Sequence, residues 1–243
     1  MVCCARKLLH TKQLDSALLA AVCLVGFTVW QHYNPREPLL PLRLFGNRNF
    51  SAASAAGLVM GAAMGGLFLP LMIYLQDSLG YSPLAAGAVT MPMFALSSIC
   101  ARQAGRLSDT VSPRMLAAGG FGALALGIGS LVCLLHPGMS LWVMMPSLLI
   151  SGIGIGAVSA PLAGVATRTL DPSLVGSASG VFNTARQLGG ALGSAATGVL
   201  LQAHIGADAT GATQAALAFP TFILVLGLAC YAAIRPACRE HSR

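Results

Sequence analysis

The chain has 243 residues and is both apolar and basic. Hydrophobic residues make up 56% of it and charged residues only 9%, with a mean hydropathy of +0.75, whereas soluble domains carry about 25% charged residues. The formal net charge of +7 does not indicate a nucleic-acid surface, because the basic residues lie in short connections between apolar runs. The sequence therefore predicts an all-α polytopic membrane protein, since helices satisfy their own backbone polar groups inside lipid.

The residue types needed for catalysis or metal binding do not occur in the usual arrangements. The seven cysteines form no CxxC pair and have no histidine at ligand spacing, so we expect no metal, no cofactor and no disulfide. The chain also lacks an HExxH motif, a Walker loop and a placed Ser/His/Asp or Cys/His set. We do not expect an enzyme.

The first apolar run, residues 14–30, follows a basic amino-terminal tail of residues 1–13. This run is longer than a signal-peptide core and has no AxA-like cleavage site before Trp30, so we expect an isolated, uncleaved transmembrane span. The polar, proline-rich and basic stretch at 31–49 is expected to be a cytoplasmic interfacial linker.

The remaining apolar runs predict a six-helix unit over residues 50–234 and a cytoplasmic tail at 235–243. Each run is long enough to cross a bilayer core of about 30 Å. Before two of the helices, the pairs Ser82–Pro83 and Asp171–Pro172 supply an N-cap residue and a proline at the first helical position. The expected helices cover residues 50–75, 83–101, 115–135, 141–166, 174–203 and 215–234.

The positions of the arginines predict the orientation of these seven spans, because Lys and Arg in short loops remain in the cytoplasm. Ten arginines follow spans 1, 3, 5 and 7, whereas the other side holds three basic residues, all in the amino-terminal tail. We therefore expect a multi-pass protein of the cell membrane, with its amino terminus outside and its carboxyl terminus in the cytoplasm. The ten are Arg36, Arg43, Arg48, Arg102, Arg106, Arg114, Arg168, Arg235, Arg239 and Arg243.

Glycines recur at four-residue spacing inside the predicted helices, which lets helix backbones approach closely in lipid. A pattern of two such glycines and a proline occurs over residues 61–70 and again over 152–161, at an offset of 91 residues. Matching interruptions in two consecutive helix triplets are a sign of a repeat-built transporter, which predicts a 3+3 inverted repeat.

The second of these stretches contains Gly152, Gly154, Gly156 and Pro161. Glycine lowers helix rigidity and proline removes one backbone hydrogen bond, so one interpretation is a flexible helix that lines a cavity. The alternative is close packing against the helix predicted over 50–75.

The connection predicted between residues 105 and 114, GRLSDTVSPR, resembles the loop signature of the major facilitator superfamily, approximately GxLaDrxGrr. Thr110 and Ser112 stand where that signature has a basic residue and a glycine. The resemblance implies that Gly105, Arg106, Asp109 and Arg114 act as a conformational latch. By itself, the stretch can also be a solvated, positively charged cytoplasmic loop.

Three further segments, 70–83, 38–45 and 183–193, are similar to the fourteen-span drug/proton antiporters of the EmrB/QacA type. The resemblance implies the carboxyl-terminal half of a proton-coupled multidrug efflux antiporter, with one preceding span and with a role in antibiotic resistance. Its expected partners are the lipid bilayer, an amphipathic small molecule and protons, with a separate amino-terminal half as a further candidate. The alternative is a truncated, non-transporting membrane protein that is inactive alone or assembles with such a half.

Proton coupling requires a protonatable group within the membrane, but none of the seven acidic residues lies deep in a predicted span. We therefore expect the coupling residues in the missing half. The charge placed inside a span is Arg186, which shares a helix face with Asn183 and Gln187. We interpret these three residues as candidates for a cavity or for the contact between halves; a structural hydrogen-bond anchor and an interfacial position are the alternatives.

Overall fold

The structure is a computed structural model that describes residues 19, 22, 23, 25, 26, 29, 30, 42–108, 110–136, 138–168, 174–203 and 209–233. The chain divides into two compact units, residues 1–43 and 44–243. In the first unit, the described residues between 19 and 30 are helical and exposed. The two tails, the rest of the span predicted at 14–30 and most of the linker lie outside the described residues.

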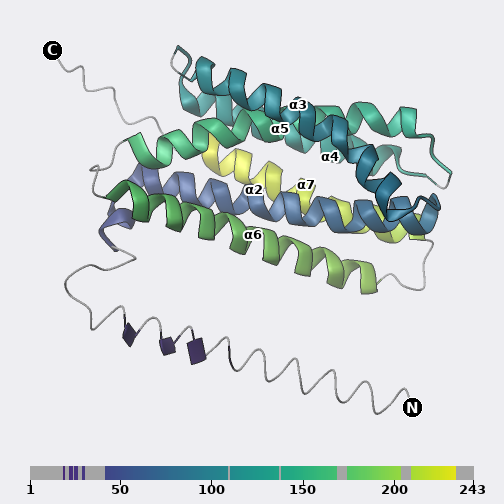
Figure 1. The fold of residues 1–243 in the computed structure, drawn as a ribbon, viewed down its shortest axis with the longest axis horizontal. Helices are drawn as coiled ribbons and strands as arrows, with labels where there is room; N and C mark the ends of the chain where they lie inside the picture. The colour runs from purple at the N-terminus through teal and green to yellow at the C-terminus, as the bar shows by residue number, and fades with distance from the viewer. Residues whose placement is uncertain are drawn as a thin grey trace. The chain divides into compact units, whose positions relative to one another are not determined.

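The second unit is a bundle of long helices, preceded by a short 3-10 helix, η1 (Leu42–Gly46) (Figure 1). All regular structure in the described part of the chain is helical. The long helices are α2 (Arg48–Ile73), α3 (Pro83–Leu107), α4 (Pro113–Leu134), α5 (Leu141–Arg168), α6 (Val175–Ala203) and α7 (Ala209–Ala233). Five segments, from α2, α3, α4, α5 and α7, are long and apolar enough to cross a membrane, whereas α6 does not meet that criterion.

The beginning of α2 is fixed by its cap. The side chain of Asn47 accepts hydrogen bonds from the backbone of Asn49 at 3.0 Å and of Phe50 at 3.3 Å, which satisfies donors that a helix start leaves free. The Phe50 ring is buried and meets Phe45 edge to face, with ring centroids 5.8 Å apart. At its other end α2 continues into a wider π turn, η2 (Tyr74–Ser78), beyond the end predicted at residue 75.

The structure confirms the predicted start of α3 and corrects its end. The Ser82 hydroxyl accepts a hydrogen bond from Ala85 N at 3.3 Å, and Pro83 occupies the first turn. The helix then continues six residues past the predicted end at 101, because nothing between Ala101 and Leu107 breaks it. Gly105 and Arg106 therefore belong to a helix, and the connection to α4 is only residues 108–112.

The other boundaries lie close to the prediction, except that of α7. This helix begins at Ala209, in a polar stretch predicted as loop up to residue 214. Its hydrogen bonds explain the difference: Gln214 donates to the carbonyl oxygens of Leu135 at 2.7 Å and Val132 at 3.3 Å. A polar residue thus becomes helical because it caps the neighbouring end of α4.

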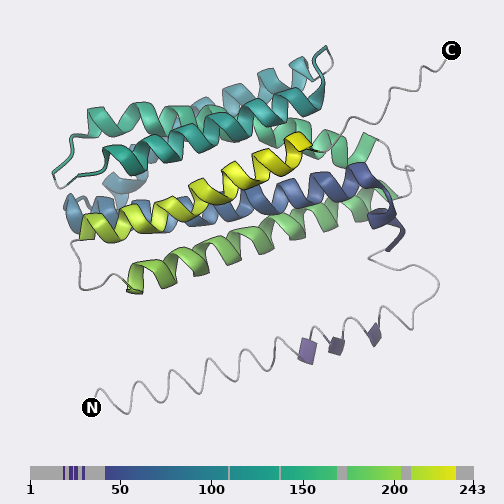
Figure 2. The same ribbon diagram turned by 180° about the vertical axis from the view of Figure 1, so that it is seen from behind.

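Two parallel helix pairs organise the bundle. Helix α6 packs mainly on α2, and α3 packs mainly on α5; along both contacts the residue numbers of the two helices rise together, so each pair is parallel. Helix α4 packs on α5 and α7, and α7 also packs on α2. Seen from behind, α7 lies in front of α2 (Figure 2). The outermost helices are consequently α3 and α6.

Candidate functional site

The contact between α2 and α6 is made by backbone against backbone. A Cβ atom on Gly61 would collide with the carbonyl oxygen of Arg186, and one on Gly65 with the carbonyl oxygen of Gly190. On the other helix, a Cβ atom on Gly189 would collide with the carbonyl oxygen of Leu58. Glycine is therefore required on both sides of this seam, in agreement with small-residue packing of membrane helices. The seam holds the backbone of Arg186 in a defined position.

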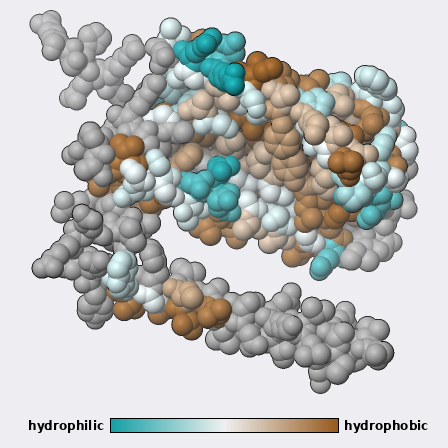
Figure 3. All heavy atoms as spheres, in the orientation of Figure 1, coloured by the Kyte–Doolittle hydropathy of each residue, from teal (hydrophilic) through white to brown (hydrophobic). Residues whose placement is uncertain are grey.

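The exposed surface of α6 beside this contact carries the predicted polar residues. Asn183, Arg186 and Gln187 are all exposed, and Arg186 Nη2 donates a hydrogen bond to Asn183 Oδ1 at 3.1 Å. Five exposed residues at three- and four-residue steps form a line beside Arg186, which we name the α6 stripe: Gly176, Gly180, Asn183, Gln187 and Ala191. Figure 3 shows a hydrophilic patch over α2 and α6 in the middle of this face.

The helices of the bundle supply no carboxylate for Arg186. None of the seven acidic residues of the sequence lies within α2, α3, α4, α5, α6 or α7. Among the described residues the acidic one is Asp77, in η2. Asp77 lies sixteen residues beyond Gly61, which contacts the backbone of Arg186. This separation is about 24 Å along the helix, so Asp77 is far from Arg186. Asn183, which accepts the hydrogen bond from Arg186, is an uncharged side chain, so no described residue of α2 to α7 compensates the positive charge.

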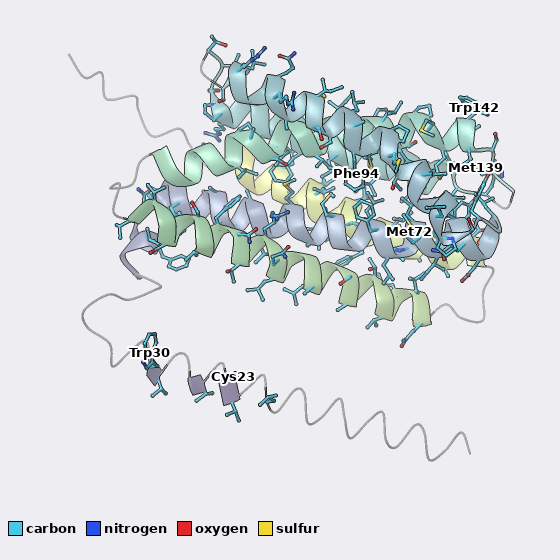
Figure 4. All side chains as sticks on the ribbon, in the orientation of Figure 1. Cys23, Trp30, Met72, Phe94, Met139 and Trp142 are labelled. Carbon is cyan, nitrogen blue, oxygen red and sulfur yellow. The ribbon has the colours of Figure 1, made fainter. Side chains whose placement is uncertain are left out.

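An apolar surface on α2 and α3 lies on the same face of the bundle as α6. The rings of Phe68 and Phe94 stack with centroids 5.5 Å apart and an interplanar angle of 3°, and Phe94 lies on the side of α3 turned toward α2 (Figure 4). Phe94 and Met91 remain exposed. Met60, Met93 and Met144, in contrast, are buried in the core.

The stretch from Gly152 to Pro161 lies in an unbroken part of α5. A Cβ atom on Gly152 would press on the backbone of Met93, and one on Gly156 on Ser97, so these two glycines pack against α3. Gly154 faces α4 instead, where a Cβ atom would lie 2.5 Å from Leu124 N. Close packing therefore accounts for the glycines, with α3 and α4 as the partners rather than α2. A flexible helix remains a prediction.

The predicted latch is described only in part, because Asp109 lies outside the described residues. Arg106 is exposed in the last turn of α3, and Arg114 is half-buried in the first turn of α4. The turn between them is tight: Val111 N donates to Leu107 O at 2.8 Å, and Ser108 Oγ donates to Gly105 O at 2.7 Å. The two arginines thus lie at the same end of the bundle, and their pairing with Asp109 remains a prediction.

The opposite end of the bundle holds long-range hydrogen bonds, donated by Tyr74 and Gln214, that the sequence did not predict and that we name the clasp. The buried Tyr74 donates its hydroxyl to the carbonyl oxygen of His136, at 2.8 Å, in the connection from α4 to α5. Together with Gln214 on α7, it joins three helix ends. Trp142 is 84% exposed at this end (Figure 4). A tyrosine and a glutamine at helix ends give no sequence signal, because their partners are backbone oxygens far along the chain.

The sequence pattern of the Major Facilitator Superfamily matches residues 13–194. The chain belongs to this superfamily. It is accordingly a multi-pass membrane protein of a transporter family, not an enzyme. Solved structures agree with this fold: a chain from a study titled "Structural insights into substrate recognition in proton dependent oligopeptide transporters" superimposes with a TM-score of 0.69 at 19% identity, over 78% of this chain and 42% of the other.

Curated relatives within the superfamily include transporters and resistance proteins. The chain is 35% identical to the uncharacterized MFS-type transporter Rv1250 of Mycobacterium tuberculosis, over 78% of this chain and 33% of the relative. It is 33% identical to the puromycin resistance protein pur8 of Streptomyces alboniger, over 83% of this chain and 39% of the relative. A probable actinorhodin transporter of Streptomyces coelicolor is 30% identical, over 81% of this chain and 35% of the relative. The chain thus spans about a third of the length of these relatives.

Proposed function

We propose that this chain is the carboxyl-terminal half of a proton-coupled multidrug efflux antiporter that works by alternating access. The observation that carries the proposal is the face formed by α3, α2 and α6. It combines a stacked aromatic pair on α2 and α3, whose apolar surface suits the body of an amphipathic compound, with an exposed arginine and amides on α6, where the other half of the transporter can make contact. The names of the relatives from Streptomyces support transport or resistance as the biological role.

The arrangement of helices supports an inverted 3+3 repeat within this half. The parallel pair α2 with α6 corresponds to the pair α5 with α3 when the triplet α2–α4 is matched to α5–α7. The glycines at 61 and 65 and those at 152 and 156 then occupy the same place in each pair. Under this proposal α6 is also a span, which gives six spans in the bundle and, with residues 14–30, seven in the chain.

The proposed orientation places the amino terminus outside and the carboxyl terminus in the cytoplasm. Arg48 at the start of α2, Arg102 and Arg106 near the end of α3 and Arg114 at the start of α4 lie at one end of the alternating bundle (Figure 1). Their side would be cytoplasmic. The latch of Gly105, Arg106, Asp109 and Arg114 would then operate at the cytoplasmic end, where it could stabilise one of two conformations.

Proton coupling requires a carboxylate that these helices do not contain, so it is assigned to the other half of the transporter. The test is a chimera in which the amino-terminal part of pur8, up to the start of the aligned segment, is fused to this chain. We expect cells with the chimera to survive puromycin and their everted vesicles to take dye up into the lumen when a proton gradient is applied. The amino-terminal part alone is the negative control, and intact pur8 the positive one.

A chimera that inserts fully but neither protects cells nor exports dye would contradict the proposal. That result would favour the alternative, a membrane protein of this superfamily that does not transport. Crossing number and orientation are measured separately, with reporter fusions after each helix. Fewer than seven crossings, or a carboxyl terminus outside, would contradict the proposed topology.

A further inference from the structure

Arg186 lies too deep in α6 to be solvated at either end of the helix. The helix has 29 residues, which is about 43 Å and exceeds a bilayer core of about 30 Å. Arg186 follows Val175 by eleven residues and precedes Ala203 by seventeen. With the helix centred, its Cα lies about 10 Å inside the nearer edge of the apolar core. A charge at that depth turns to protein or to water rather than to lipid.

The α6 stripe beside Arg186 has the shape of a helix-packing surface. A Cβ atom on Gly176 or Gly180 would meet nothing within 4 Å. The bundle itself therefore does not pack against these two glycines, whereas Gly189 packs against α2. Small residues let a second backbone approach, and Asn183 and Gln187 offer hydrogen bonds across such a contact. The apolar side chains exposed on α6 lie on a separate side of the helix, at Leu188, Leu192 and Val199.

We propose that a transmembrane helix carrying a carboxylate covers the α6 stripe and pairs with Arg186. Charge complementarity decides the occupant, because an uncompensated guanidinium is costly in a low-dielectric setting and α2–α7 contain no acidic residue. A second copy of the same bundle would bring a second arginine and no carboxylate from these helices. The inference rests on the proposed function for the source of this helix, which is the amino-terminal half of the transporter.

The pair has a defined geometry on the side of this chain. The seam with α2 fixes the backbone of Arg186 through Gly61, and Asn183 Oδ1 holds one terminal nitrogen of the guanidinium. The remaining N–H groups can donate to both oxygens of a carboxylate, a geometry that lysine could not match. Arg186 is thereby a specificity determinant for which helix docks on α6.

The test uses the full chain in lipid vesicles and synthetic transmembrane helices as probes. Three leucine- and alanine-based peptides differ at one central residue, which is Glu, Gln or Lys. We expect the Glu peptide to associate with the chain about 30-fold more tightly than the Gln peptide, measured by energy transfer. Arg186→Gln should remove this difference, whereas Arg102→Gln, at an exposed position near the end of α3, should retain it.

Charge reversal provides the second measurement. Arg186→Glu should bind the Lys peptide in preference to the Glu peptide, and a cysteine substituted at Gln187 should cross-link to the bound peptide. Equal binding of the Glu and Gln peptides to the native chain would overturn the inference, as would an unchanged preference in Arg186→Gln. Neither measurement involves transport, so these results are distinguishable from a failure of the efflux chimera.

Discussion

The two outermost helices of the bundle, α3 and α6, are held in the same way but present different surfaces. Each runs parallel to one inner helix and touches it through glycines, α6 on α2 and α3 on α5. The exposed side of α3 is apolar along much of its length, with Leu84, Met91, Phe94 and Ile99. The exposed side of α6 carries an arginine and two amides. Although the two helices pack equivalently, lipid can cover the exposed apolar side of α3 but not the arginine and amides exposed on α6.

The largest expected effect concerns the seam that gives α6 its place. Gly61→Val should destabilise the chain by about 3 kcal/mol, because the added side chain enters the backbone of α6 at Arg186. The thermal midpoint in mild detergent measures this loss. Gly180→Val is the matched control: its side chain enters open space on the same helix pair, and its midpoint should stay near that of the native chain. A Gly61→Val variant as stable as the native chain would contradict the close backbone packing of α2 against α6.

The second prediction exchanges the character of the two exposed faces. Arg186→Leu should favour membrane insertion of the segment 175–203, and Met91→Arg should disfavour insertion of the segment 83–107, each by about 3 kcal/mol. A glycosylation reporter attached to each segment in microsomes gives the inserted fraction. The comparison fails if α6 inserts as well as α3 without the change, since Arg186 would then lie outside the apolar core.

A third prediction addresses how the two helix pairs are joined. Tyr74→Phe removes the hydrogen bond to the carbonyl oxygen of His136 but keeps the ring that fills the core. The loss should be about 1 kcal/mol, seen as a lower thermal midpoint in detergent. Tyr81→Phe, a half-buried tyrosine seven residues along the chain, serves as the control. An equal loss in both variants would show that the clasp does not stabilise the bundle.

The smallest effect is expected at the superfamily loop motif. A Cβ atom on Gly105 would meet only Ala160 Cβ, at 3.9 Å, and Gly105 is helical. Gly105→Ala should therefore change stability by less than about 0.5 kcal/mol. Preserved stability together with altered transport by the complete protein would assign this glycine to conformational change. A large loss of stability would instead place it in packing, as at Gly61.

The sequence by itself determined that this is an all-α membrane protein. A helix surrounded by lipid needs a long apolar run with few charges, and such runs can be read directly from the sequence. It also located five of the six helices of the bundle within a few residues of their observed starts and, from the cap at Ser82, the start of α3. The resemblance of residues 70–83 and 183–193 to a transporter family agreed with the superfamily that the comparisons show. Local signals were sufficient for these conclusions.

Only the tertiary structure decided which glycine belongs to which contact. The spacing of Gly152 and Gly156 is the same as that of Gly61 and Gly65, yet one pair meets α3 and the other α6, and Gly176 with Gly180 meets nothing. Spacing places residues on a helix face, but the partner of that face depends on how all six helices pack. For the same reason, the sequence placed Arg186 on a helix, whereas the bundle shows that its side chain points away from the core and finds no carboxylate there.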